Sequence, residues 1–171
     1  EKRRFWEVNG PYLLGSIIHH MILDPRDSKT ILMAAQTKSH GPMIFKSVDF
    51  GMNWVPVKSP PKFSSSKKLA HIYRLTPGHE SEPNIWYAGT SPQGLFKSID
   101  FGDTWQEVSG FNNNPQIDEW CGNSVVSTLK YEKIHSIMVH PQNPASLIIG
   151  MSSGGVFEST DAGKSWASMN E

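Results

Sequence analysis

Cysteine and long apolar runs are what this 171-residue sequence has least of. Its single cysteine, Cys121, cannot form an internal disulfide and does not supply the thiolate set of a structural zinc site. No apolar stretch approaches the roughly 20 residues that cross a bilayer, and the charged first residues lack the apolar segment of a signal peptide. We therefore expect a soluble chain with no membrane span and no signal peptide, in a compartment that the composition leaves open.

Net charge is missing as well, because 16 Lys and Arg residues balance 16 Asp and Glu residues. Nucleic acids and anionic membranes attract strongly basic surfaces, so we expect neither as a partner. The sequence also lacks a Gly-rich phosphate loop, an H-E-x-x-H motif and a G-x-S-x-G motif. It predicts no cofactor and no bound metal.

An eight-residue pattern, S-x-D-x-G-x-x-W, occurs three times and is the strongest signal in the chain. Each copy, which we call an octet, lies between two short apolar runs and so predicts the turn of a β-hairpin. Ser and Asp side chains accept hydrogen bonds from turn N–H groups, Gly adopts a positive φ, and Trp packs on the sheet. The octet residues predicted to be structural are Ser47, Asp49, Gly51, Trp54, Ser98, Asp100, Gly102, Trp105, Ser159, Asp161, Gly163 and Trp166.

Each octet belongs to a longer repeat in which four strands are expected. The octets start 51 and 61 residues apart, which fits the blades of a β-propeller with insertions between them. The sequence thus predicts an all-β fold of about three four-stranded antiparallel blades with octet hairpins. A small two-sheet sandwich is the alternative, but it does not require the same hairpin chemistry three times. The expected parts are a strand of a preceding blade (1–12), blades at 13–60, 69–110 and 133–171, and insertion loops at 58–69 and 110–134.

Three blades are fewer than the four to eight that close a propeller. Residues 5–8 resemble residues 105–108, as if they completed a blade whose other strands lie elsewhere. The simplest expectation is the N-terminal part of a longer propeller. If the chain is complete, two copies should join head to tail into a six-bladed ring that covers the end blades.

The octet is the Asp-box, or BNR, motif, and the chain resembles the β-propellers that carry it: sialidases, xyloglucanases, sortilin-type receptor ectodomains and photosystem II assembly factors. The segment RRFWEVNGPYLLG, LDPRD at residues 23–27 and PGHESEP at residues 77–83 are similar to bacterial BNR-repeat glycosyl hydrolase or exo-sialidase-like proteins. This resemblance covers nearly the whole chain. It implies a propeller whose ligands bind on the face opposite the octet turns.

A histidine lies six residues before the proline that closes each first strand: His19, His71 and His135. This spacing predicts three imidazoles at the start of the innermost strands, around the mouth of the central channel. Two interpretations are open. The histidines pack between blades as a repeated structural residue, or they bind an anionic or sugar ligand with help from His20 and Arg74.

The second insertion carries Asp118, Glu119 and Trp120, a combination of acidic and aromatic side chains that is typical of sugar sites. Alternatively, Trp120 packs back onto the blades. Catalytic residues are unknown, because a glycosidase needs two carboxyl groups in one cleft and the sequence names no such pair. We expect a module that binds a carbohydrate or protein ligand. The alternative is a glycoside hydrolase of the sialidase-like, BNR type with a non-standard or incomplete active site.

Overall fold

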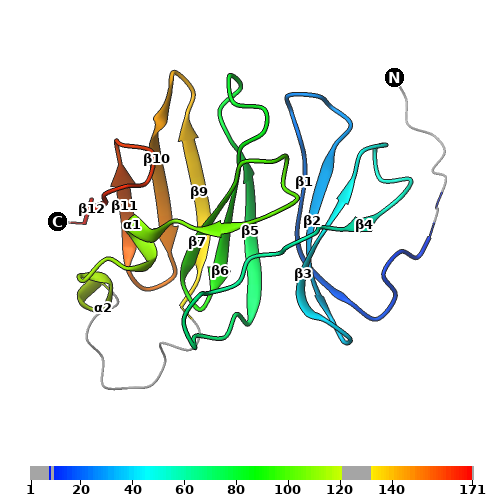
Figure 1. Ribbon diagram of the computed structural model, residues 1–171, viewed down its shortest axis with the longest axis horizontal. Helices are drawn as coiled ribbons and strands as arrows, with labels where there is room; N and C mark the ends of the chain where they lie inside the picture. The colour runs from blue at the N-terminus through cyan, green and yellow to red at the C-terminus, as the bar shows by residue number, and fades with distance from the viewer. Residues whose placement is uncertain (1–7, 9, 121–131, 171) are drawn as a thin grey trace.

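The structure, a computed structural model, describes residues 8, 10–120 and 132–170, which form three four-stranded antiparallel sheets (Figure 1). Blade 1 contains β1 (Ile17–Leu23), β2 (Ile31–Thr37), β3 (Gly41–Ser47) and β4 (Val55–Pro56). Blade 2 contains β5 (His71–Pro77), β6 (Trp86–Ser91), β7 (Gly94–Ser98) and β8 (Gln106–Glu107). Blade 3 contains β9 (Ile134–His140), β10 (Asn143–Met151), β11 (Gly155–Ser159) and β12 (Ala167–Ser168).

The sheets stand side by side with β1, β5 and β9 innermost, because β1 packs against β5 and β5 against β9 (Figure 1). The all-β propeller prediction is confirmed. Most of residues 1–12, which were expected to supply a strand of a preceding blade, lie outside the described residues. Segment 110–134, expected to be a loop, contains most of α1 (Ser109–Asn112) and all of α2 (Ile117–Trp120), two four-residue helices.

Each octet forms the turn between the third and fourth strands of its blade. In blade 2, Ser98 Oγ donates to Asp100 Oδ1 (2.8 Å) and accepts the Gly102 N–H (2.9 Å). The other carboxylate contacts come from the Thr104 N–H (2.9 Å) and hydroxyl (2.7 Å). Gly102 has a φ of +83°, in the left-handed region that the turn requires.

Equivalent contacts form in the other two octets and hold the pKa of Asp49 and of Asp161 at about 2, mainly through hydrogen bonds from Asn53 and Ser165. These aspartates are therefore occupied by their own turns. The links between blades leave from the opposite end of the fourth strands, because each octet joins strands that run antiparallel.

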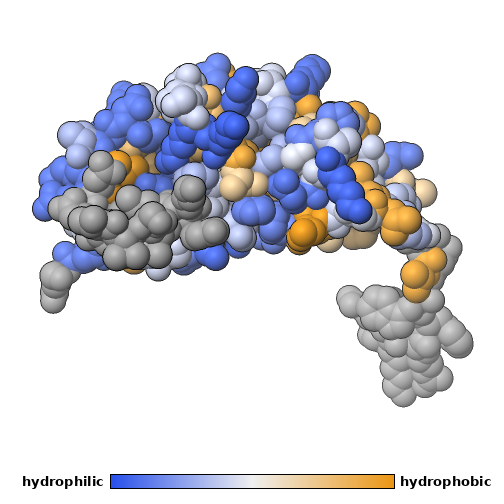
Figure 2. Space-filling view, turned by 90° about the horizontal axis from the view of Figure 1, so that it is seen from below, coloured by the Kyte–Doolittle hydropathy of each residue, from blue (hydrophilic) through white to orange (hydrophobic). Residues whose placement is uncertain are grey.

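Two of the octet tryptophans lie in the cores between their own blade and the preceding one. Trp105 belongs to the core between blades 1 and 2, and Trp166 to the core between blades 2 and 3; both are at most 7% exposed. Among the described residues no blade precedes that of Trp54, which is only half-buried. Hydrophobic side chains gather at this blade 1 end of the molecule (Figure 2), where Met21 and Leu23 are exposed on the same sheet face.

The far face of blade 3 is open in the same way. Val156 and Met169 are 41% and 50% exposed, whereas Ile44 and Val57, which occupy the equivalent strand positions in blade 1, are buried against blade 2. The two ends of the structure thus present the two halves of the interface that is buried at each internal junction.

Arg26 ties blade 1 to blade 2. Its guanidinium donates to both carboxylate oxygens of buried Asp24, at 2.7 and 2.9 Å, and lies 5.0 Å from the centre of the Trp86 ring. Its Nη1 donates to the carbonyl oxygens of Glu82 and Ile85, both at 3.0 Å. The LDPRD and PGHESEP segments therefore meet at this junction.

Candidate functional site

The histidine expected at one place in every blade does not lie at one place. In β5, Pro77 is still paired with the neighbouring strand, whereas Pro25 and Pro141 lie two residues beyond the equivalent pairs. An alignment that counts back from the prolines therefore places blade 2 two residues out of register with blades 1 and 3. The residues equivalent to His19 are Tyr73 and His135, each of which lies at an irregularity in strand pairing near the start of the innermost strand.

The fold nevertheless brings His19 and His71 together. Their ring centroids are 4.8 Å apart, and Tyr73 lies 5.0 Å from His19 and 5.6 Å from His71. Lys133, the residue of blade 3 equivalent to His71, places its ammonium 4.7 Å from the Tyr73 ring centre. We call these four residues the inner-edge cluster. They lie at the ends of the innermost strands from which the inter-blade links arrive.

Two nitrogens of this cluster are buried without a hydrogen-bond partner among the described residues: His19 Nε2 and His71 Nδ1. Burial, and then the neighbouring His71, lowers the pKa of His19 and favours the neutral imidazole. A neutral imidazole both donates and accepts a hydrogen bond. The cluster thus offers aromatic faces, a cation and unused polar atoms at one point, which is the chemistry of a small polar-ligand site.

His20 and Arg74 occupy equivalent positions one residue further along and contact each other. His20 Nε2 is 3.2 Å from Arg74 Nη1, and its Nδ1 accepts the Leu75 N–H at 3.3 Å. Burial, and then Arg74, lowers the pKa of His20. Arg74 in turn donates to Thr76, whose hydroxyl donates to the Ile137 carbonyl of β9. This chain of contacts links the three innermost strands.

The remaining predicted site residues lie apart from the inner-edge cluster. His135 is exposed and its Nδ1 is 3.0 Å from the neighbouring Ser136 hydroxyl. Trp120 packs back onto blade 3, with its ring 4.4 Å from that of Phe157, as the structural interpretation of the insertion expected. Glu119 is exposed in α2, and the side chain of Asp118 lies outside the described residues.

Sequence reasoning missed Tyr73 and Lys133. The signal that would have found Tyr73 is an apolar pair spaced by two residues, which reads IHHM in blade 1, IYRL in blade 2 and IHSI in blade 3. Aligning these pairs gives the register that the strands adopt. The pairs are core residues in blades 2 and 3, whereas Ile18 and Met21 hold the equivalent positions on the open face of blade 1 and are exposed. The same alignment makes Lys133 the counterpart of His71.

Within the described ranges, no group of three or more His, Cys, Asp and Glu side chains is arranged to hold a metal ion. Over the same ranges, no helix has the length and apolar character needed to cross a membrane. The architecture is that of part of a β-propeller.

No known protein-family profile matches the chain. It is 24% identical over 160 residues to a Neosartorya fischeri protein described as a probable oligoxyloglucan-reducing end-specific xyloglucanase, a match that covers 92% of this chain and 18% of that protein. The GH74 xyloglucanase of Xanthomonas campestris has a similar structure, with a TM-score of 0.60 and 21% identity over 91% of this chain and 23% of its own.

Two further structures are similar. The GH74 enzyme of Niastella koreensis has a TM-score of 0.58 and 17% identity over 90% of this chain and 22% of its own. YCF48 from Cyanidioschyzon merolae has a TM-score of 0.56 and 12% identity over 92% of this chain and 41% of its own. The chain spans less than a quarter of the length of the GH74 enzymes and of the fungal relative. The structural similarities identify the fold.

Proposed function

We propose that this chain is part of an Asp-box β-propeller that binds carbohydrate at the inner-edge cluster. The observation that carries the proposal is the pair of buried imidazole nitrogens of His19 and His71, which find no hydrogen-bond partner in the described part of the chain and lie beside the Tyr73 ring. A sugar hydroxyl can both donate and accept a hydrogen bond, so it can pair with an imidazole nitrogen of either kind, while an aromatic ring stacks on the apolar face of a pyranose. The similarity to xyloglucanases supports a carbohydrate over a peptide as the ligand.

The test is calorimetric titration with xyloglucan oligosaccharides and with cello-oligosaccharides. We expect His71→Ala and Lys133→Ala to weaken binding about tenfold or more, which corresponds to about 1.4 kcal/mol. His135→Ala is the matched control, because His135 is an exposed histidine outside the cluster. A large fall in the melting temperature of His71→Ala with unchanged affinity of the folded protein would show that the cluster serves packing.

A glycoside hydrolase is the second candidate, favoured by the similarity to GH74 enzymes. Its test is the release of reducing ends from xyloglucan and of the aryl group from an aryl sialoside. The acids to substitute are Glu119, which is exposed, and Glu132, which is buried next to Lys133 in sequence. Turnover that is lost in Glu119→Gln or Glu132→Gln would establish the enzyme. If the chain binds xyloglucan without turnover, the hydrolase is rejected and the binding function is retained.

We further propose that two copies of the chain join head to tail, so that the open face of blade 1 in each copy packs against the open face of blade 3 in the other. The support is continuity with the internal junctions, since the face around Trp54 is equivalent to the one that carries buried Trp105. Light scattering should then give the mass of a dimer, and Trp54→Arg should give a monomer. A wild-type monomer would contradict this assembly and leave further blades of a longer chain as the occupant.

A further inference from the structure

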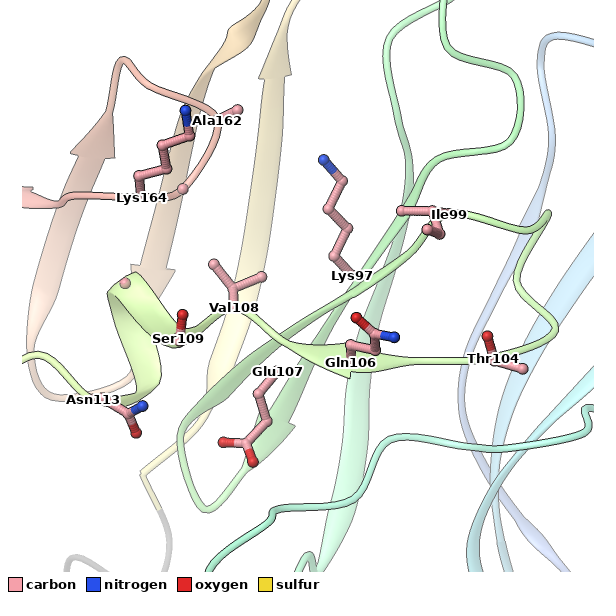
Figure 3. A pocket seen from close by; sticks show the side chains of 12 residues that line it. Lys97, Ile99, Thr104, Gln106, Glu107, Val108, Ser109, Asn113, Ala162 and Lys164 are labelled. Atoms are coloured by element: carbon pink, nitrogen blue, oxygen red, sulfur yellow. The ribbon is translucent and has the colours of Figure 1, made fainter.

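A groove of about 530 Å³ lies at the outer part of the junction between blades 2 and 3, on different strands from the inner-edge cluster (Figure 3). One wall is formed by β7 and β8, which contribute Lys97 and Gln106. The other wall is the octet turn of blade 3, which contributes Lys164. Gly110 presses against this turn so closely that a Cβ would meet the Lys164 carbonyl oxygen at 2.2 Å. Two lysines from separate blades therefore line one hollow.

The junction between blades 1 and 2 contains the equivalent groove, with a volume of about 310 Å³ and different charges. There, Asp103 follows the octet glycine and binds Lys46 at 2.5 Å, with Lys58 3.6 Å away. Lys46 is equivalent to Lys97, because each precedes the octet serine. Asp103 is equivalent to Lys164, because each follows the octet glycine. The groove of blades 2 and 3 thus has a cation where its counterpart has the carboxylate.

No other carboxylate takes this place among the described residues. Glu107 lines the groove, but its oxygens accept hydrogen bonds from the Ser64 N–H at 2.6 Å and from Asn112 at 3.1 Å. None of the ion pairs between described residues includes Lys97 or Lys164. Lys97 is half-buried, with its ammonium 5.6 Å from the ring centre of Tyr87. The groove therefore has two cations and, among the residues that the structure describes, lacks the carboxylate that its counterpart supplies from Asp103.

We propose that this groove binds a carboxylated sugar, with the carboxylate between Lys97 and Lys164 in the role that Asp103 has at the preceding junction. The rest of the lining favours a hydroxyl-rich ligand. Gln106, Ser109 and Asn113 also line the groove and are exposed, and they add amide and hydroxyl groups to its lining (Figure 3). The volume lies within the range of small-ligand pockets, roughly 300 to 1,000 Å³.

The test is a titration of the full chain with D-glucuronate and with a galacturonate trisaccharide, followed by calorimetry and by NMR shifts of the Lys164 amide. D-glucose is the neutral control and acetate is the control for a carboxylate alone. Lys164→Asp restores the charge arrangement of the other junction. We expect it to weaken uronate binding about tenfold to a hundredfold, the range of a charge-assisted hydrogen bond, without lowering the melting temperature.

Lys68→Asp is the matched control, because it makes the same charge change at an exposed lysine outside the groove. It should leave binding unchanged, as should His71→Ala, which alters only the inner-edge cluster. Equal losses in Lys164→Asp and Lys68→Asp would overturn the site, as would a wild-type chain that binds neither uronate. If acetate or N-acetylglutamate binds as tightly as glucuronate, the assignment to a sugar is wrong.

Discussion

Removing the Arg26 side chain tests how much of the stability rests on a single inter-blade contact. Arg26→Ala deletes the two side-chain bonds to Asp24, the bonds to the Glu82 and Ile85 carbonyls and the contact with Trp86, and leaves the bond from the backbone N–H of residue 26 to Asp24. Both partners of the ion pair are at most 8% exposed, so the substitution leaves a buried carboxylate without its cation. Breaking such a pair costs about 3 to 5 kcal/mol, a large part of the stability of an ordinary domain.

The assay is equilibrium unfolding in urea, with Lys46→Ala as the control. Lys46 pairs with Asp103, but this pair is 18% and 30% exposed, so its loss should cost only about 1 kcal/mol. The double variant Arg26→Ala with Asp24→Asn should recover part of the loss, because it removes the uncompensated charge. If Arg26→Ala costs no more than Lys46→Ala, the reasoning about burial is refuted.

Two further predictions concern packing and pH. Trp105→Ala should lower the free energy of unfolding by about 3 to 5 kcal/mol, and Trp54→Ala by about 1 kcal/mol at low protein concentration, because Trp105, unlike Trp54, is covered by a preceding blade. Equal costs in urea unfolding would mean that the blade 1 face is covered. Folding lowers the pKa of His19 and His20 below the ordinary value of 6.5, so the unfolded chain binds more protons than the folded one as the pH falls. The contribution of these histidines to the free energy of unfolding is therefore fully present above pH 6.5 and decreases on acidification. Urea midpoints at about pH 7.5 and pH 5.5 measure this, and a slope unchanged by His20→Gln would contradict it.

The fold could be predicted from the sequence because the octet is a local device. Its Ser, Asp and Gly interact within one turn, so three copies predict three hairpins regardless of what surrounds them. Strand order within each blade then follows from the short connections between consecutive strands. The helices α1 and α2 escaped prediction because each has only four residues, too few for a helical period.

The candidate site could be predicted only in part, because it depends on register between strands. Proline marks the end of β5 at a different position from the other innermost strands, so it gave His71 the wrong counterparts. A bulge in β1 and the inter-blade packing together bring His19 to His71. The Lys97 and Lys164 groove was out of reach for the same reason, since its two lysines come from different blades.

Because Trp105 and Trp166 are each covered by the preceding sheet while Trp54 is not, adding one more sheet before blade 1 would bury one such ring and expose another. The contacts between neighbouring blades do not by themselves set the number of blades. Only the accumulated rotation between successive sheets, which must return to its starting point, limits their number. Duplication or deletion of a blade can therefore change the length of such an array without a new kind of contact, while the residue after each octet glycine varies in charge between Met52, Asp103 and Lys164.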